Sequence, residues 1–330
     1  MLRGFDACIN IGYIDSPPFS FESRRGPNLP DGLLVQLMEL FLQLLGVHWK
    51  WQPIPFARVV ESLENRSVDL ISGFILDAPS RQTRGRFIPL DMPFAIGINA
   101  VTRSPDLQTG MKYNDLAALL QGGSSLHQHR FGIVTVLDEI ADEFFPALFM
   151  GVEPTIRDDQ RSVKEALRYY TSEHPDRDLQ IVFADSMSCS RLLPPGAKLL
   201  LTDPIGRFQG GFLLPVHDED WAQYFGNAFH GFLKARLPQV GRLFSDYSQQ
   251  LLGFLQTSDR PLALTGNANS SGMPGHDRRE FWTLRDWLQA YWPRELPVPP
   301  EFCQHLAQHE HDEAGGCEVV VDDSQTKDRP

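Results

Sequence analysis

The sequence lacks any apolar run long enough to cross a lipid bilayer. A membrane-spanning helix needs about 20 consecutive apolar residues, and every apolar segment here is interrupted by charged residues, prolines or glycines before that length. We therefore expect a protein that is not membrane-spanning. The first fifteen residues, MLRGFDACINIGYID, also lack an apolar segment followed by a small-residue cleavage site. Either an export signal has been removed from this sequence or the gene encodes none.

Blocks of basic residues are lacking as well. The chain has 30 Lys and Arg against 42 Asp and Glu, which gives a formal net charge of −12 at pH 7. Proteins that bind nucleic acids usually carry a basic patch or stripe, because contacts with phosphates dominate their affinity. The charge balance therefore argues against a nucleic-acid partner.

Cysteines are few and widely spaced. They form no Cys-x-x-Cys pair and no disulfide framework, so they do not indicate the redox compartment; they are Cys8, Cys189, Cys303 and Cys317. Near the C-terminus, His305 and His309 would share one face of a helix, but the spacing of these histidines and the nearby cysteines matches no structural zinc pattern. We expect a solvated polar end there, with no metal and no cofactor.

Motifs typical of several enzyme classes are lacking too. The sequence contains no G-x-x-x-x-G-K-[ST] phosphate loop and no G-x-S-x-G nucleophile elbow. Asp138, Glu139 and Asp142 could supply acid–base chemistry in a cleft, but their spacing singles out no catalytic pair. These residues therefore single out no catalytic site, although they do not exclude one.

The sequence does contain a repeated alternation of short apolar strands and amphipathic helices. Strands are predicted in CINIGYI, VHWKWQPI and VDLISGFI, and helices in DGLLVQLMELFLQLLG and FARVVESLENRS. This order implies parallel pairing of the strands. A second α/β unit follows over roughly 105–200, and two long extended segments, FAIGINAVTRSPD and QGGFLLPV, join the two units. The 330 residues thus predict a bilobal protein.

The last part of the chain has a different composition. TSDRPLALTGNANSSGMPGHD is typical of a linker and the final fifteen residues are polar, so we expect partial disorder. Between them, REFWTLRDWLQAYWP predicts a helix with Phe281, Leu284, Leu288 and Tyr291 on one side. Such an apolar stripe is more typical of packing than of a ligand site.

The order of these segments resembles the family 3 extracellular solute-binding proteins, which are type II periplasmic binding proteins for polar amino-acid uptake. INIGYIDSPPFSF, PIPFARVVESLENRSVDLISG, SRQTRGRFIPLDMPF and LQIVFADSMSCSRLL carry the resemblance, which covers residues 9–252. It implies an α/β, two-lobed type II periplasmic-binding-protein fold with two crossing hinge strands. Lobe 1 would comprise 5–98 plus 212–252, lobe 2 would comprise 99–211, and 253–330 would form a C-terminal extension.

The resemblance also implies a ligand site between the lobes. Arg81, twelve residues after Asp69, matches the arginine that binds a ligand carboxylate in this family, and its planar guanidinium suits bidentate binding. The alternative is a surface residue or a partner for Asp77. Asp185, at the end of a predicted strand, would receive the ligand ammonium. Asp185 could also cap the following helix, and both roles can hold together.

Four further residues complete the site that the resemblance implies. Phe56 would cover the ligand side chain, although it could equally be a core residue, and Ser16 would face it. Gly73 would leave room for contacts with the ligand backbone. Asp138 replaces part of a Gly-Thr-Thr-like turn that serves as an anion cradle in the family. An aspartate there would repel a carboxylate, so the ligand could be unusual, more cationic or absent.

The leading hypothesis is non-catalytic binding of a small polar, amino-acid-like solute for ABC-type uptake or sensing. The implied partners are an ABC permease or a membrane receptor, with the protein acting as a monomer. The resemblance implies a periplasmic or extracellular location, whereas the lack of a predicted signal leaves a cytoplasmic one open. Two alternatives remain: a dehydratase of cyclohexadienyl acids on the same scaffold, and a sensor or interaction domain that needs no ligand.

Overall fold

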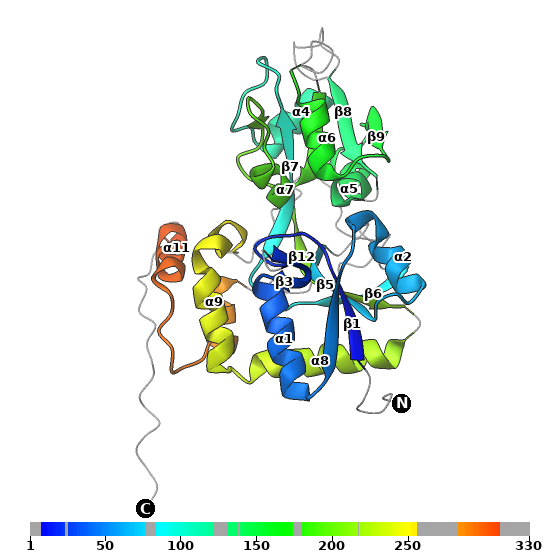
Figure 1. Cartoon of the computed structure of the whole chain (residues 1–330). Helices are drawn as coiled ribbons and strands as arrows, with labels where there is room; N and C mark the ends of the chain where they lie inside the picture. The colour runs from blue at the N-terminus through cyan, green and yellow to red at the C-terminus, as the bar shows by residue number, and fades with distance from the viewer. Residues whose placement is uncertain are drawn as a thin grey trace, which may run out of the picture.

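The computed structural model has two lobes joined by a narrow waist (Figure 1). It describes residues 8–23, 26–76, 84–121, 131–137, 139–173, 180–216, 218–255 and 283–310. The sheets and helices form the two-lobed type II periplasmic-binding-protein fold that the sequence predicts. Among the described residues, no helix is long and apolar enough to span a membrane.

Lobe 1 contains the parallel strands that the alternation of strands and helices predicts. β1 (Cys8–Tyr13) pairs in parallel with β4 (His48–Pro53) on one side and with β5 (Leu70–Leu76) on the other. β12 (Ile205–Pro215) runs antiparallel beside β5, and β6 (Gly85–Pro89) runs antiparallel beside β12. The parallel strands therefore end at the same edge of the sheet.

The predicted helices of lobe 1 form for local reasons. α1 (Leu33–Leu45) buries one apolar face that includes Phe41, and it ends at Gly46 with φ of 67°. That left-handed conformation suits glycine, which has no Cβ to clash with the backbone. The second predicted helix is a 3₁₀ turn, η1 (Phe56–Arg58), followed by α2 (Val59–Glu64).

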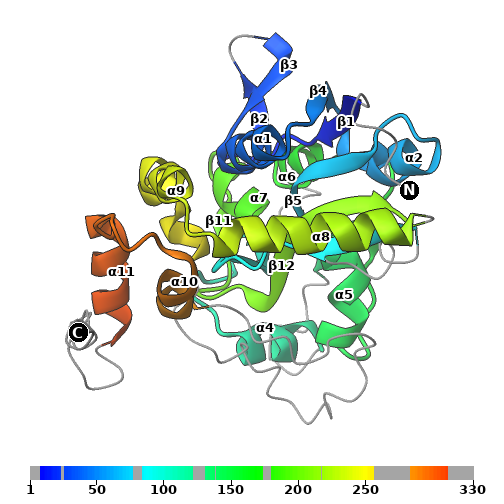
Figure 2. The ribbon, with the colours of Figure 1, turned by 90° about the horizontal axis from the view of Figure 1, so that it is seen from below.

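Two further helices cover lobe 1. α8 (Glu219–Lys234) crosses the underside of the lobe, and α9 (Pro238–Leu251) lies beside α1 (Figure 2). The ring of Phe41 packs edge-on against Phe225 of α8 with centroids 5.5 Å apart. A small separate sheet of β2 (Phe21–Ser23) and β3 (Gly26–Asp31) precedes α1.

Lobe 2 has a second sheet with its own parallel strands. β10 (Gln180–Asp185) and β8 (Gly132–Val136) are parallel, and β9 (Ile156–Asp158) continues the parallel set beside β8. β7 (Ala95–Thr102) pairs antiparallel with β10, and β11 (Lys198–Leu199) pairs with β7. Three strands of this lobe therefore point the same way.

A helix follows each of the three parallel strands of lobe 2. α5 (Ile140–Leu148) follows β8, α6 (Val163–Tyr170) follows β9, and α7 (Ser186–Arg191) follows β10. The sequence predicts a second α/β unit over roughly 105–200, and these three helices lie within it. It does not predict α4 (Tyr113–Leu120), which lies between β7 and β8.

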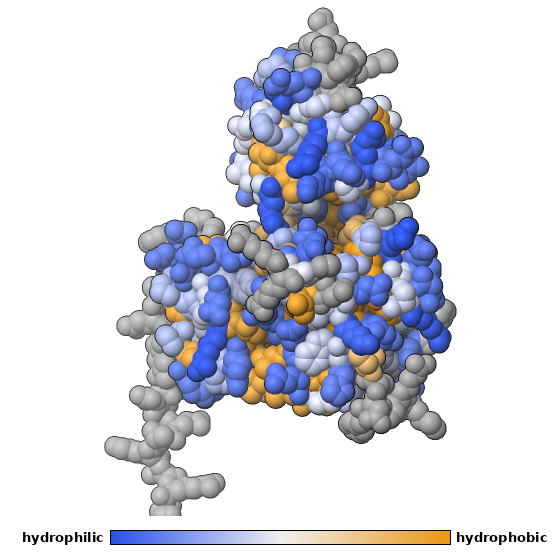
Figure 3. Space-filling model, in the orientation of Figure 1, coloured by the Kyte–Doolittle hydropathy of each residue, from blue (hydrophilic) through white to orange (hydrophobic). Residues whose placement is uncertain are grey.

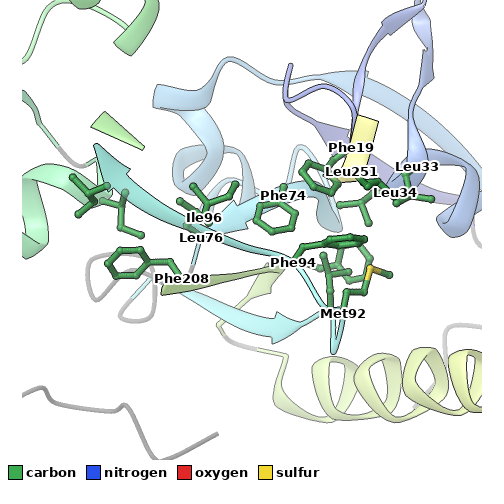
Figure 4. Close-up of a cluster of buried hydrophobic side chains, with 14 of the residues drawn as sticks. Phe19, Leu33, Leu34, Phe74, Leu76, Met92, Phe94, Ile96, Phe208 and Leu251 are labelled. Carbon is green, nitrogen blue, oxygen red and sulfur yellow. The ribbon is translucent and has the colours of Figure 1, made fainter. Parts of the chain in front are cut away.

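The hinge consists of β7 and β12, which pair with each other and carry the chain between the lobes. They approach closely, because a Cβ placed on Gly97 would lie 2.7 Å from the carbonyl oxygen of Gly206. Buried apolar residues continue through this region, from the core of lobe 1 to Ile96 and Phe208 (Figure 4). The ring of Phe208 also packs against Phe144 of α5, with centroids 4.7 Å apart. We propose that the boundaries of the lobes lie within these strands, near residues 98 and 212.

The helical part of the C-terminal extension packs on lobe 1. α10 (Leu284–Tyr291) places Trp287 against Phe244 of α9, with ring centroids 4.4 Å apart. Arg236 donates hydrogen bonds to two carbonyl oxygens at the end of α10, at 2.7 and 2.8 Å. α11 (Pro300–Glu310) lies beside α9 (Figure 2). The extension is therefore part of the fold of lobe 1.

The predicted apolar stripe of the extension is confirmed where the structure describes it. Leu284 and Tyr291 are buried, and Leu288 is partly buried. Phe281 lies outside the described residues. The linker-like segment 257–277, between η3 (Leu252–Phe254) and α10, and the polar last fifteen residues also lie outside the described residues.

Candidate functional site

The carboxyl ends of the parallel strands of both lobes are directed toward the waist. In Figure 1, β1 rises from the N-terminal end of lobe 1 toward the waist, and α5 and α7 lie at the lower edge of lobe 2. The space-filling view shows the molecule hollowed between the lobes, with apolar residues gathered at the waist (Figure 3). Open α/β sheets usually bind ligands at the carboxyl ends of their strands, so the waist is the first place to examine.

Asp185 is the best-defined of the predicted site residues. It ends β10, is 9 % exposed, and accepts a hydrogen bond from the backbone N–H of Ser188 at 2.8 Å. The predicted capping role is therefore confirmed, because this bond satisfies a free amide in the first turn of α7. Cys189 lies just beyond, and burial, assisted by the charge of Asp185, raises the pKa of its thiol well above the usual value. A nucleophilic role for Cys189 is disfavoured.

Ser16 is brought to the same place from lobe 1. It is 6 % exposed, and its Oγ donates a hydrogen bond to Sδ of Met187, in α7, at 3.9 Å. The neighbouring carbonyl oxygen of Pro17 accepts a hydrogen bond from the guanidinium of Arg191, also in α7. Ser16 of lobe 1 therefore contacts the helix of lobe 2 that Asp185 caps.

Phe56 and Gly73 lie in lobe 1 near the carboxyl ends of β4 and within β5. The side chain of Phe56 is 37 % exposed, so the alternative that it is a core residue is wrong. A Cβ on Gly73 would lie 2.7 Å from the side chain of Ile14 and 3.4 Å from Oγ of Ser20. Glycine there allows the loop after β1 to pack on β5, and a contact between Gly73 and a ligand stays a prediction.

Two predicted site residues, Arg81 and Asp138, lie outside the described residues. The structure describes the strand that precedes Arg81, which ends at Leu76. It also describes the turn next to Asp138, where Leu137 is 42 % exposed. The predicted meeting of Arg81 and Asp185 across the waist therefore stays a prediction.

The entrance to α5 differs from the anion cradle of the family. The N–H of Leu137 donates to the carbonyl oxygen of Asp158 at 3.0 Å, so that amide is used within the protein. Asp142, in the first turn, is 4 % exposed and accepts a hydrogen bond from Oγ1 of Thr135 at 2.6 Å. It also lies 3.0 Å from Nε of Arg157. Asp142 and Arg157 thus form an ion pair beside the first turn of this helix.

Sequence reasoning missed the lobe-bridging roles of Met187 and Arg191. Both belong to a helix of six residues, which is too short to show an apolar periodicity. Their partners lie 171 and 174 positions away in the sequence. The only local signal is that an arginine follows the capping aspartate within two helical turns.

Other features of the described residues do not suggest a competing site. No three His, Cys, Asp or Glu side chains in the described ranges are placed to hold a metal ion. A groove of about 470 Å³ lies between β6 and α8, and one of about 680 Å³ lies between β3, α1 and α9. Both lie on lobe 1 and contain none of the predicted site residues. The predicted site residues that the structure describes lie instead at or near the strand ends.

Solved structures share this fold. An ancestral arginine-binding protein bound to arginine aligns with a TM-score of 0.52 and 13 % identity, over 74 % of this chain and 99 % of its own. The glutamine-bound form of an ancestral arginine-binding protein aligns with a TM-score of 0.51 and 15 % identity, over 73 % and 97 %. A mutant of ArgBP from T. maritima aligns with a TM-score of 0.50 and 19 % identity, over 73 % and 95 %. At these identities the likeness shows the fold alone.

The sequence comparison identifies the family. No curated protein matches the chain closely enough to be reported as a relative. Residues 9–237, well over half of the chain, match the family described as bacterial extracellular solute-binding proteins, family 3. This range covers lobe 2, the two hinge strands, the contact between Ser16 and α7, and lobe 1 to the end of α8. The chain therefore belongs to the bacterial extracellular solute-binding proteins, family 3.

Proposed function

We propose that this protein binds a small polar, amino-acid-like solute between its lobes, without catalysing a reaction on it. The observation that carries the proposal is the convergence at the waist of the Ser16 loop from lobe 1 and the Asp185-capped helix from lobe 2. Membership of a solute-binding family supports it. So do proteins of the same fold that are described as bound to arginine or glutamine.

The chemistry of the site suits a zwitterion. Asp185 is nearly buried, and a buried carboxylate needs hydrogen bonds or an opposite charge to offset its lost hydration. The ligand ammonium would bind Asp185, the ligand carboxylate would bind Arg81, and the exposed ring of Phe56 would cover the ligand side chain.

Binding would act through closure of the lobes. A ligand favours a closed state only by the extra contacts that it makes there, and contacts with both lobes supply such a difference. The paired strands β7 and β12 form the hinge around which the lobes would close. We propose that the monomer delivers its ligand to an ABC permease or a membrane receptor, outside the cytoplasm.

Titration calorimetry of the full chain with a panel of L-amino acids tests this proposal. Saturable heat with at least one amino acid is expected, with weaker binding of the matching acid that lacks the amino group. No heat from any member of the panel, with folded protein, would favour the ligand-independent alternative. A second assay with a prephenate-like substrate tests the dehydratase alternative, because formation of an aromatic product would overturn the non-catalytic part of the proposal.

A further inference from the structure

We propose that Arg191 is a positioning residue, and that α7 acts as a strut that holds the two lobes together when no ligand is bound. The guanidinium of Arg191 in lobe 2 donates to the carbonyl oxygen of Pro17 in lobe 1. The effect of this contact on ligand affinity rests on the proposed function. Its effect on the separation of the lobes does not.

Three contacts are distributed along this one short helix. Asp185 caps its first turn, Met187 contacts Ser16 of lobe 1, and Arg191 in its last turn contacts Pro17. Six helical residues span about 9 Å, so the two lobe 1 contacts and the candidate ligand carboxylate lie on one small rigid element. A movement of α7 relative to lobe 1 would therefore move Asp185 as well.

The loop that receives Arg191 is itself fixed to lobe 1. The N–H of Ser16 donates to the carbonyl oxygen of Ser20 at 2.6 Å, and Oγ of Ser20 donates to the carbonyl oxygen of Ile14 at 2.7 Å. The carbonyl oxygen of Pro18 accepts the N–H of Leu33, at the start of α1, at 3.0 Å. The loop that Arg191 contacts is therefore held to the rest of lobe 1 by its own hydrogen bonds.

The other side of α7 is attached to the hinge. The N–H of Gly97, in β7, donates to Oγ of Ser186 at 3.3 Å. The helix thus connects a hinge strand with the loop of lobe 1 on which Arg191 ends. A rotation about the hinge that moves the lobes apart would break the contact between Arg191 and Pro17. This contact therefore favours the arrangement in which the lobes are close together.

Such a strut increases the fraction of molecules that are ready to bind. The apparent affinity of a ligand is its intrinsic affinity multiplied by the fraction of the protein that is in the binding-competent arrangement. This fraction is the same for all ligands. Arg191 is exposed to water, so we expect its loss to weaken every ligand by about three- to tenfold. A residue that contacts the ligand would instead change the order of affinities within the panel.

The test compares Arg191→Gln with a matched control, Arg103→Gln. Arg103 also donates to a proline carbonyl, that of Pro195 at 3.1 Å, but both residues belong to lobe 2. Small-angle X-ray scattering of the ligand-free proteins should show a larger radius of gyration for Arg191→Gln and an unchanged one for Arg103→Gln. Glutamine has a donor but a shorter, uncharged side chain, so Arg191→Lys, whose long cationic side chain can still bring a donor to the carbonyl oxygen of Pro17, should recover part of the difference.

Calorimetry of the same variants completes the test. Arg191→Gln should weaken all binding members of the panel by one common factor, whereas Arg103→Gln should not. An unchanged radius of gyration in folded Arg191→Gln would overturn the strut, and so would a loss restricted to one class of ligand. If the wild-type protein binds nothing in the panel, the proposed function fails, and the scattering result alone decides whether Arg191 holds the lobes together.

Discussion

Asp158 and Asp185 occupy equivalent positions in lobe 2, and their surroundings differ in one decisive respect. Each is the last residue of a parallel strand, and they are 4 % and 9 % exposed. Asp158 lies 2.9 Å from Nη1 of Arg161, three residues later, and also accepts two backbone N–H groups at 3.0 and 3.1 Å. Arg191, in the helix that follows Asp185, instead donates a hydrogen bond to the carbonyl oxygen of Pro17 in lobe 1.

The comparison shows that a strand end alone does not make a ligand site. A buried carboxylate needs compensation, and Asp158 receives it from an arginine of its own loop. Asp185 accepts an amide N–H of α7 and caps this helix, which contacts Ser16. A ligand cation is disfavoured beside Asp158, because Arg161 already supplies the opposite charge there. The following predictions, from the largest expected effect to the smallest, test this contrast.

The largest effect is expected for Arg81→Ala. If Arg81 pairs with the ligand carboxylate opposite Asp185, its removal leaves that carboxylate buried without a partner and should cost at least about 2 kcal/mol of affinity. Titration calorimetry measures the loss. The matched control is Arg84→Ala, because Arg84 is exposed and pairs with Glu64 at 2.7 Å. An affinity unchanged by Arg81→Ala would remove this residue from the site.

Asp185→Asn should separate the two roles of this residue. Asparagine caps a helix about as well as aspartate, so the stability of the fold should change little. The loss of a charge-assisted hydrogen bond should weaken zwitterions by about 2 kcal/mol and affect simple acids much less. The control is Asp218→Asn, since Asp218 caps α8 by accepting the N–H of Trp221 at 3.2 Å. Equal losses for zwitterions and acids would mean that Asp185 is only a cap.

Asp158→Asn should have the reverse effect. Its side chain can still accept the backbone N–H groups, but the pairing with Arg161 is lost, so the free energy of unfolding should fall by about 1 kcal/mol. Ligand affinity should stay the same. Urea denaturation combined with calorimetry measures both quantities. A variant of normal stability that binds amino acids more weakly would show that the two aspartates had been assigned the wrong roles.

The pH dependence of the unfolding free energy should differ between the wild-type protein and Asp158→Asn. Burial alone would raise the pKa of Asp158, but hydrogen bonds from the side chain of Arg161 and the backbone of Gln160 outweigh it and hold the pKa below the usual 3.8. A group whose pKa is lowered by folding stabilises the protein above its unfolded pKa. This contribution is lost as the pH falls below about 4.

The measurement is denaturation of the wild-type protein and of Asp158→Asn at pH 7, 5, 4 and 3. The difference in unfolding free energy between the two proteins should be constant from pH 7 to pH 5 and should shrink as the pH falls below about 4. A difference that persists undiminished at pH 3 would contradict the lowered pKa and the pairing that causes it.

Much of the fold follows from local patterns in the sequence. The apolar spacing of α1 and Gly46 at its end predict that helix, and the strand–helix alternation predicts the parallel pairing of β1, β4 and β5. α4 was missed because its residues lack a strong apolar face, and only Leu116 is buried there. β6 was missed because it pairs with β12, a strand more than a hundred residues away in the sequence.

The candidate site is less predictable from the sequence than the fold. The cap at Asp185 follows from an aspartate that ends an apolar strand before a short helix, a local signal. The contacts of Met187 and Arg191 depend on how the hinge places α7 against the loop at Pro17, which no local pattern encodes. The types of residue in the sequence can therefore suggest which charged groups form the site. The residues that position these groups can be identified only from the three-dimensional structure.

A crystal structure of the full chain with a bound amino acid tests the central claim most directly. Our account predicts the ligand at the waist, with its ammonium within hydrogen-bond distance of Asp185 and its carboxylate on the guanidinium of Arg81. A ligand bound elsewhere, or one at the waist that contacts neither side chain, would contradict it.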